Sequence, residues 1–187
     1  VMVNGHDITT IPESFRYGSV CFQDYCTYSL SVRENVAFGD IAMLNNDEDI
    51  YNAIEMSRLE FSSFDNDIDR QITKLFDSNG IVLSGGQSQK LSLSRAFLFK
   101  NGLIVLDEPS ASLDVITENE IFDTALKLMQ GRTTIVITHR LANVVYCDRI
   151  VYLDSGRICE EGTHTDLMKQ NGKYAELFSI QVQKYIS

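Results

Sequence analysis

The fold of this chain is decided by two short stretches, Leu83-Ser84-Gly85-Gly86-Gln87 and Leu103-Ile104-Val105-Leu106-Asp107-Glu108-Pro109. The first places a serine and two glycines at the opening of a helix that is predicted to run from about Ser88 to Lys100. Helix N-termini carry unpaired N–H groups and partial positive charge, and glycine leaves room for an anion to approach them. The first stretch therefore predicts a site for a phosphate group.

The second stretch is an apolar strand that ends in two adjacent carboxylates. A strand end places Asp107 where its carboxylate can hold Mg²⁺, directly or through water. It places Glu108 where its carboxylate can act as a base toward an attacking water. Either stretch alone could be an ordinary Gly-rich turn or a core strand. Together, in this order, they favour phosphate chemistry.

The composition is that of one globular domain. The chain has 187 residues, of which 44% are hydrophobic and 22% charged, enough for one compact core and too few for two ordinary domains. Its net charge of −10 argues against non-specific binding of nucleic acid, which depends on a basic face. No apolar run approaches the length of a membrane-spanning helix. We therefore expect any contact with a membrane to go through a partner or a segment outside these residues.

The cysteines and histidines form no recognisable metal-binding pattern. Cys21, Cys26, Cys147 and Cys159 include no C-x-x-C pair and have no histidine at zinc-finger spacing. Cys21 lies in an apolar segment and is expected in the core.

The first part of the chain is predicted to alternate short strands with helices. Asn4-Gly5 indicates a hairpin, and residues 18–22 form an apolar strand that ends at Gln23. Ser31 and Glu34 have capping-box spacing, which predicts a helix that stops before Gly39. From about Ile41 to Phe76 the pattern is helical and acidic, with one apolar face formed by Ile50, Ala53, Ile54 and Ser57.

The second part continues the alternation. Residues 115–130 are predicted to form an amphipathic helix, and residues 133–138 are predicted to form a strand that is too apolar to be half exposed. Asp154-Ser155-Gly156 indicates a hairpin, and two helices follow, the last from about Lys173 to Tyr185. This order predicts an α/β fold with a mostly parallel, covered sheet and an antiparallel accessory.

The two opening stretches resemble the nucleotide-binding domain of ABC transporters, with residues 83–87 as the signature motif and residues 103–108 as the Walker B strand. The resemblance implies a P-loop NTPase-like fold, in which helices flank the sheet and a small helical subdomain is inserted. It implies that residues 1–40 and 99–187 belong to the catalytic core, and that about 41–98 form the helical subdomain with the signature motif.

The resemblance also implies roles for single residues. Gln23 stands where the family has its Q-loop glutamine, a ligand of Mg²⁺ or of water, and His139 stands at the switch histidine, which contacts the γ-phosphate. Asp114, in Ala111-Ser112-Leu113-Asp114, resembles the D-loop aspartate at the dimer contact. The plain alternatives are a surface glutamine, a core-edge histidine and a helix N-cap. Residues implied to contact ATP across the dimer are Ser84, Gly85, Gly86 and Gln87.

One motif of the family does not occur in these residues. No G-x-x-x-x-G-K-[ST] string, whose backbone and lysine would hold the phosphates, is found in residues 1–187. The opening residues 1–8 resemble the strand and turn that follow the P-loop helix in the family. We therefore expect an N-terminally truncated domain without Walker A.

The end of the chain resembles exporters. Residues 172–178 are similar to ATPase domains fused to exporter-type membrane domains, whereas residues 74–80 depart from the T-x-V-G-E-x-G string that is frequent there. The resemblance implies ATP and Mg²⁺ as cofactors, a second nucleotide-binding domain paired head to tail, and transmembrane domains as partners. It implies a place at the cytoplasmic face of the cell membrane and no nucleic-acid partner.

Three functions are compatible with these motifs to different degrees. The first is the ATPase motor of an ABC exporter, coupling ATP-driven dimerisation to transport. The second is a truncated, non-hydrolytic subunit that only docks on a complete domain. The third is a chromosome-maintenance or DNA-repair ATPase, in which a long coiled coil precedes the signature. Residues 24–82 are too few for that coiled coil and contain no heptad run, so the third is disfavoured.

Overall fold

The structure is a computed structural model that describes residues 2–3, 6–7, 18–99, 102–109, 117, 121–123 and 132–186. The chain divides into two compact units, residues 1–137 and 138–187. At its start, β1 (Met2–Val3) and β2 (His6–Asp7) pair antiparallel, with Val3 opposite His6. These flanking strands agree with the hairpin predicted at Asn4-Gly5, whose own residues lie outside the described ranges.

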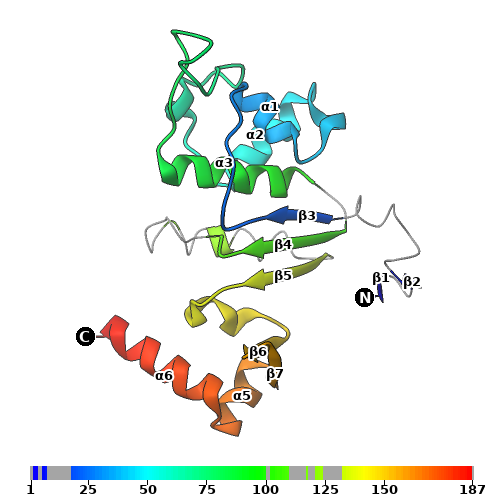
Figure 1. Cartoon of the computed structure of the whole chain (residues 1–187), viewed down its shortest axis with the longest axis vertical. Coiled ribbons are helices and arrows are strands. Elements are labelled where there is room, and N and C mark those ends of the chain that lie inside the picture. The colour runs from blue at the N-terminus through cyan, green and yellow to red at the C-terminus, as the bar shows by residue number, and fades with distance from the viewer. Residues whose placement is uncertain are drawn as a thin grey trace. The chain divides into compact units, whose positions relative to one another are not determined.

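A parallel sheet forms the centre of the first unit. It contains β3 (Gly18–Cys21), β4 (Leu103–Asp107) and β5 (Thr133–Ile137), in that order across the sheet. All three strands run in the same direction (Figure 1), as parallel strands linked by long connections do. The α/β fold with a mostly parallel sheet is thereby confirmed. The carboxyl ends of the strands meet at one edge, which positions the residues that follow them.

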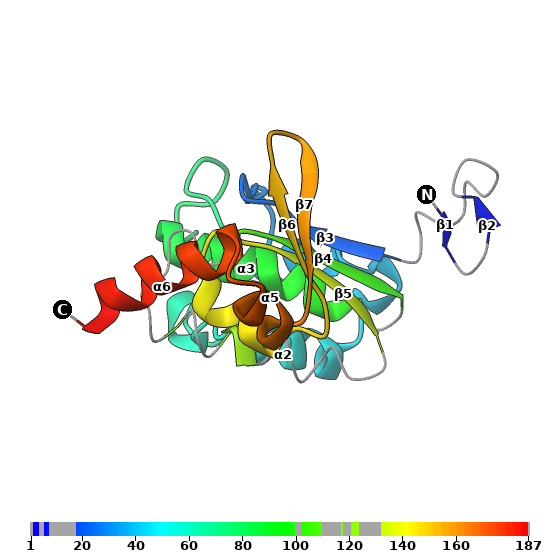
Figure 2. The ribbon, with the colours of Figure 1, turned by 90° about the horizontal axis from the view of Figure 1, so that it is seen from below.

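Helix α3 (Gly85–Leu98) packs against β3, beside which it runs in Figure 1, and Figure 2 shows the same elements from below. The Ser19 hydroxyl donates to the Ala96 carbonyl at 3.0 Å, which fixes β3 against the helix. The apolar layer between them consists of Cys21, Leu93, Ala96, Phe97, Ile104, Leu106 and Ile121. Cys21 is only 1% exposed, so the prediction that it lies in the core is confirmed.

The opposite face of the sheet is open within the described ranges. Val20, Ile135 and Ile137 are 47%, 48% and 50% exposed. The prediction that residues 133–138 are too apolar to be half exposed is therefore wrong for this structure. Period-2 alternation puts Ile135 and Ile137 on the face away from α3, and no described element covers that face.

The helical part of the first unit has its own core. It is built from α1 (Val32–Ala37), η3 (Ile41–Met43), α2 (Asp47–Met56), η4 (Phe61–Phe64) and α3. The Ser31–Glu34 capping box forms as predicted, and the predicted face of α2 is buried. The buried residues of this core include Val32 and Val36, which precede the expected subdomain start near residue 41. The division at 40/41 stays a prediction.

The second unit joins a hairpin to two helices. It contains η5 (Leu141–Tyr146), β6 (Ile150–Asp154), β7 (Arg157–Gly162), α5 (His164–Gln170) and α6 (Lys173–Ile186). Ser155 and Gly156 both have positive φ, 51° and 74°, as a two-residue hairpin turn requires. The predicted hairpin and terminal helices are confirmed. Among the residues described, no helix combines the length and apolarity needed to cross a bilayer.

Candidate functional site

The first turn of α3 is held by a reciprocal cap. The Ser84 hydroxyl accepts from the Gln87 N–H at 3.3 Å, and the Gln87 side-chain carbonyl accepts from the Ser84 N–H at 2.7 Å. This capping box starts the helix at Gly85, three residues earlier than the predicted Ser88. The two glycines are thus inside the first helical turn, which corrects the expectation that they precede the helix.

The cap leaves two donors at this helix end unused. Gln87 also donates through Nε2 to the Ser63 hydroxyl of η4 at 2.9 Å, so both ends of its amide group are hydrogen-bonded. The N–H groups of Gly85 and Gly86 find no acceptor among the described residues. Because these are the first two N–H groups of a fourteen-residue helix, they carry the positive end of its dipole. The turn can therefore bind an anion such as a phosphate oxygen.

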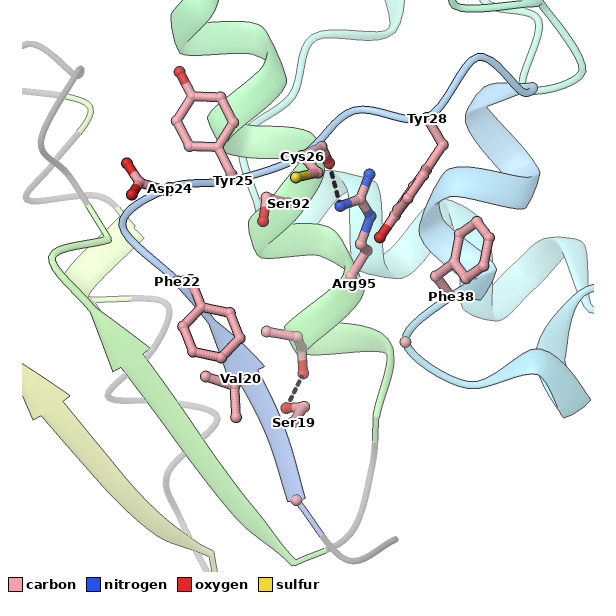
Figure 3. Close-up of a pocket in the computed structure, with 13 residues that line it drawn as sticks. Ser19, Val20, Phe22, Asp24, Tyr25, Cys26, Tyr28, Phe38, Ser92 and Arg95 are labelled. Carbon is pink, nitrogen blue, oxygen red and sulfur yellow. Dashed lines mark hydrogen bonds between the residues drawn. The ribbon is translucent and has the colours of Figure 1, made fainter. Parts of the chain in front are cut away.

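A pocket of about 380 Å³ lies between the end of β3 and α3 (Figure 3). Its cationic group is Arg95, which donates from Nε and Nη2 to the backbone and side-chain oxygens of Asn35, at 2.8 and 2.7 Å. Arg95 also donates from Nη1 to the Cys26 carbonyl at 2.5 Å and lies 5.0 Å from the centre of the Tyr28 ring. Burial lowers the pKa of Arg95. This guanidinium fastens the segment that follows Gln23 to α1 and α3.

The carboxylates Asp107 and Glu108 lie at the end of β4. Asp107 is the last residue of the strand and stands opposite Ile137 of β5, and both carboxylate residues are half-buried. The Glu108 N–H donates to the Ile137 carbonyl at 2.9 Å, and Glu108 has φ of 45°. A left-handed backbone is uncommon for a residue with a side chain and marks the abrupt turn at which the chain leaves the sheet.

The described residues fit Mg²⁺ only as part of a larger coordination shell. They contain no group of three or more His, Cys, Asp or Glu side chains arranged so that it could hold a metal ion. Mg²⁺ is usually held by one or two carboxylates together with water and substrate phosphates. Asp107 supplies one such carboxylate at the strand end, so the donor set fits a metal that arrives with a nucleotide.

The remaining predicted site residues are placed to different extents. Gln23 is exposed and lies two residues past the end of β3. Because β3 and β4 are parallel, the residues that follow both strands lie at the same edge of the sheet. His139 is exposed and belongs to the second unit, where its carbonyl accepts from Gln181 Nε2 at 2.7 Å. Asp114 lies outside the described residues. The roles of all these side chains stay predictions.

Sequence reasoning missed one contact at this site. The Tyr25 hydroxyl donates to the Gly85 carbonyl at 2.8 Å, across sixty positions of sequence. The only signal was proximity in sequence, since Tyr25 follows Gln23 by two residues.

Comparison with known proteins identifies the family. The profile described as ABC transporter matches residues 1–111. The chain belongs to the ABC transporter family. This membership confirms the resemblance to ABC transporters, while the assignment of single motifs stays a prediction.

Three relatives are named as a multidrug resistance protein, a transport ATP-binding protein and a lipid A-core flippase. The multidrug resistance protein sirA of Leptosphaeria maculans is 36% identical over 85% of this chain and 12% of its own length. The subtilin transport ATP-binding protein SpaT of Bacillus subtilis is 35% identical over 95% of this chain and 29% of its own. The ATP-dependent lipid A-core flippase of Pseudomonas putida is 38% identical over 88% of this chain and 27% of its own.

A solved structure agrees with this assignment. The ATP-bound structure of a bacterial Atm1-family ABC exporter superposes with a TM-score of 0.83 at 28% identity, covering 96% of this chain and 31% of that one. The chain thus has the fold of an ABC exporter nucleotide-binding domain. It spans less than a third of the length of each of these relatives.

Proposed function

We propose that this chain is part of the ATP-hydrolysing motor of an ABC exporter, where it closes head to tail on a second nucleotide-binding domain. The observation that carries the proposal is the capped first turn of α3, where the N–H groups of Gly85 and Gly86 have no acceptor within the described part of the chain. In this arrangement the turn binds the γ-phosphate of an ATP that sits on the P-loop of the other domain. Ser84 and Gln87 hold the turn in shape through the capping box.

The catalytic roles follow from the chemistry of the strand ends. Glu108 accepts a proton from the attacking water, and His139 hydrogen-bonds the γ-phosphate and that water. Asp107 and Gln23 would hold Mg²⁺, which neutralises charge on the phosphate oxygens when bound. Asp114 would lie at the contact between the two domains. Closure of the domains would be coupled to transmembrane domains at the cytoplasmic face of the membrane.

A non-hydrolytic docking subunit is the second candidate. It corresponds to the alternative weighed from the sequence, a subunit that would dock on a complete domain without using a P-loop of its own. The presence of both Asp107 and Glu108 favours the enzyme, because a subunit that only docks needs neither a metal carboxylate nor a base. We expect the 187-residue chain alone not to hydrolyse ATP, since the P-loop supplies most phosphate contacts in the family.

The test uses what we call the completed domain, in which a segment with the G-x-x-x-x-G-K-[ST] pattern is fused ahead of residues 1–187. In this protein Glu108→Gln should lower ATP turnover by about two to four orders of magnitude, because an amide cannot accept the proton. Binding of ATP should persist, and ATP should now trap a dimer. Glu55→Gln, at an exposed position of α2, is the matched control and should keep wild-type turnover. Near-normal turnover by Glu108→Gln would exclude Glu108 as the base.

A further inference from the structure

Tyr25 connects the segment after Gln23 to the first turn of α3. Its hydroxyl donates to the carbonyl of Gly85 at 2.8 Å and lies 3.5 Å from the point that a Cβ on Gly85 would occupy. Tyr25 is half-buried, and its ring lines the pocket beside α3 in Figure 3. The bond therefore reaches the same helical turn that offers the unused N–H groups.

The segment that carries Tyr25 is anchored a second time. One residue further on, the Cys26 carbonyl accepts from Arg95 Nη1 in the middle of α3. Residues 25 and 26 are thus bonded to α3 at two levels, near its start and about ten residues along it. With both bonds in place, the chain leaving β3 cannot shift along α3 without breaking one of them.

The contact with Tyr25 joins the first turn of α3 to a different part of the protein from the other contacts of that turn. The capping box between Ser84 and Gln87 is internal to the helix, and the bond from Gln87 to Ser63 ties the turn to η4 in the helical part. Tyr25 is the contact, among the described residues, that ties this turn to the segment leaving the sheet. The sheet edge is also where Gln23 and Asp107 lie.

We propose that Tyr25 is a positioning residue that fixes the Gly85 and Gly86 N–H groups relative to the sheet edge, and so sets how tightly the signature turn binds a partner's γ-phosphate. This inference rests on the proposed function. Without the hydroxyl, the turn would sample more orientations, and the apparent affinity would fall in proportion to the competent fraction. A single hydrogen bond of this kind corresponds to an effect of about three- to tenfold.

The test is Tyr25→Phe in the completed domain, with Glu108→Gln as the trapping background. Light scattering would give the ATP concentration for half-maximal dimerisation, which should rise by about three- to tenfold. The affinity of the monomer for ATP should stay at its parent value, and the melting temperature should fall by no more than about 6 °C, because the folded monomer loses one hydrogen bond. Tyr28→Phe is the matched control, because its hydroxyl has no hydrogen bond among the described residues while its ring stays over Arg95. This control should dimerise like the parent.

Mixed dimers separate positioning from a general structural effect. If only one subunit has a functional P-loop lysine, ATP is sandwiched between that subunit's P-loop and the other subunit's signature. Tyr25→Phe should weaken dimerisation when it is placed in the subunit opposite the functional P-loop, and have no effect in the same subunit. The proposal would be overturned if Tyr25→Phe weakened dimerisation equally in both placements. It would also be overturned if the variant lowered both the melting temperature and the affinity of the monomer for ATP beyond the loss of one hydrogen bond.

Gly86→Asp distinguishes failure of this inference from failure of the proposed function. If Gly86→Asp blocks dimerisation while Tyr25→Phe behaves like Tyr28→Phe, the role of Tyr25 is wrong and the signature site stands. If Gly86→Asp also dimerises normally, the signature site itself is wrong.

Discussion

Gly86→Asp tests the anion site most directly, because it places a negative charge at the turn that is proposed to bind one. Gly86 is the second residue of α3, and its N–H has no acceptor among the described residues. For folding, the substitution should be close to neutral. A carboxylate in the first turn gains about 0.3–1 kcal/mol from the helix dipole, and replacing glycine in a helix relieves a similar cost. For a chain of this size, the melting temperature should stay level or rise by about 2–4 °C.

For dimerisation the effect should be large and opposite in sign. A carboxylate about 4 Å from a γ-phosphate oxygen, at an effective dielectric constant of about 20, costs on the order of 4 kcal/mol. Such a penalty weakens association by about a thousandfold. If the turn contacts phosphate, Gly86→Asp should therefore leave folding almost unchanged and strongly weaken dimerisation.

The assay is light scattering of the completed domain with ATP, on the Glu108→Gln background that traps dimers. Gly86→Asp should remain monomeric at ATP concentrations that dimerise the parent. Gly86→Asn introduces a side chain of nearly the same size as Asp but without the charge. Its ATP concentration for half-maximal dimerisation should lie between those of the parent and Gly86→Asp. The difference between the Asn and Asp variants gives the electrostatic cost. If Gly86→Asp dimerises at the parent's ATP concentration, the signature interpretation is refuted, and the motif is only a turn before a helix.

Two further predictions concern ATP binding and turnover. In isothermal titration calorimetry, the 187-residue chain should bind Mg-ATP far more weakly than the completed domain, and micromolar affinity for the chain alone would contradict this. His139→Ala in the completed domain should retain ATP binding but lose most turnover in a phosphate-release assay, since it removes the side chain that we propose to contact water and γ-phosphate. Unchanged turnover would reduce His139 to a structural residue.

Much of the architecture was predictable from local patterns. The Ser31–Glu34 box, the buried face of α2 and the hairpin at Ser155-Gly156 depend on contacts within a few residues, and each forms as predicted. The start of α3 was misplaced because two glycines are poor helix formers. The predicted start therefore fell after them. The cap by Ser84 and Gln87 outweighs that preference and draws both glycines into the first turn.

Burial on the sheet was harder to predict, because it depends on what covers each face. The apolar character of residues 133–138 indicates that this strand can be buried on both sides, yet only the face toward α3 is covered by described elements. The sequence shows that the Ile135 and Ile137 side chains are apolar and can therefore be buried. Their exposure is decided by packing between distant segments, which no local pattern contains.

The Tyr25 contact is the part of the candidate site that the sequence motifs could not predict. Ser84, Gly85, Gly86, Asp107 and Glu108 are recognisable because their spacing is short and their chemistry is typical of phosphate sites. The hydroxyl of Tyr25 reaches Gly85 only because β3 and α3 pack together, through Ser19 and Cys21 on one side and Ser92 and Ala96 on the other. The donors at the helix start are thus placed by the sheet as well as by their own cap. A change far from the signature in sequence should therefore alter its affinity for phosphate without altering its conformation within α3.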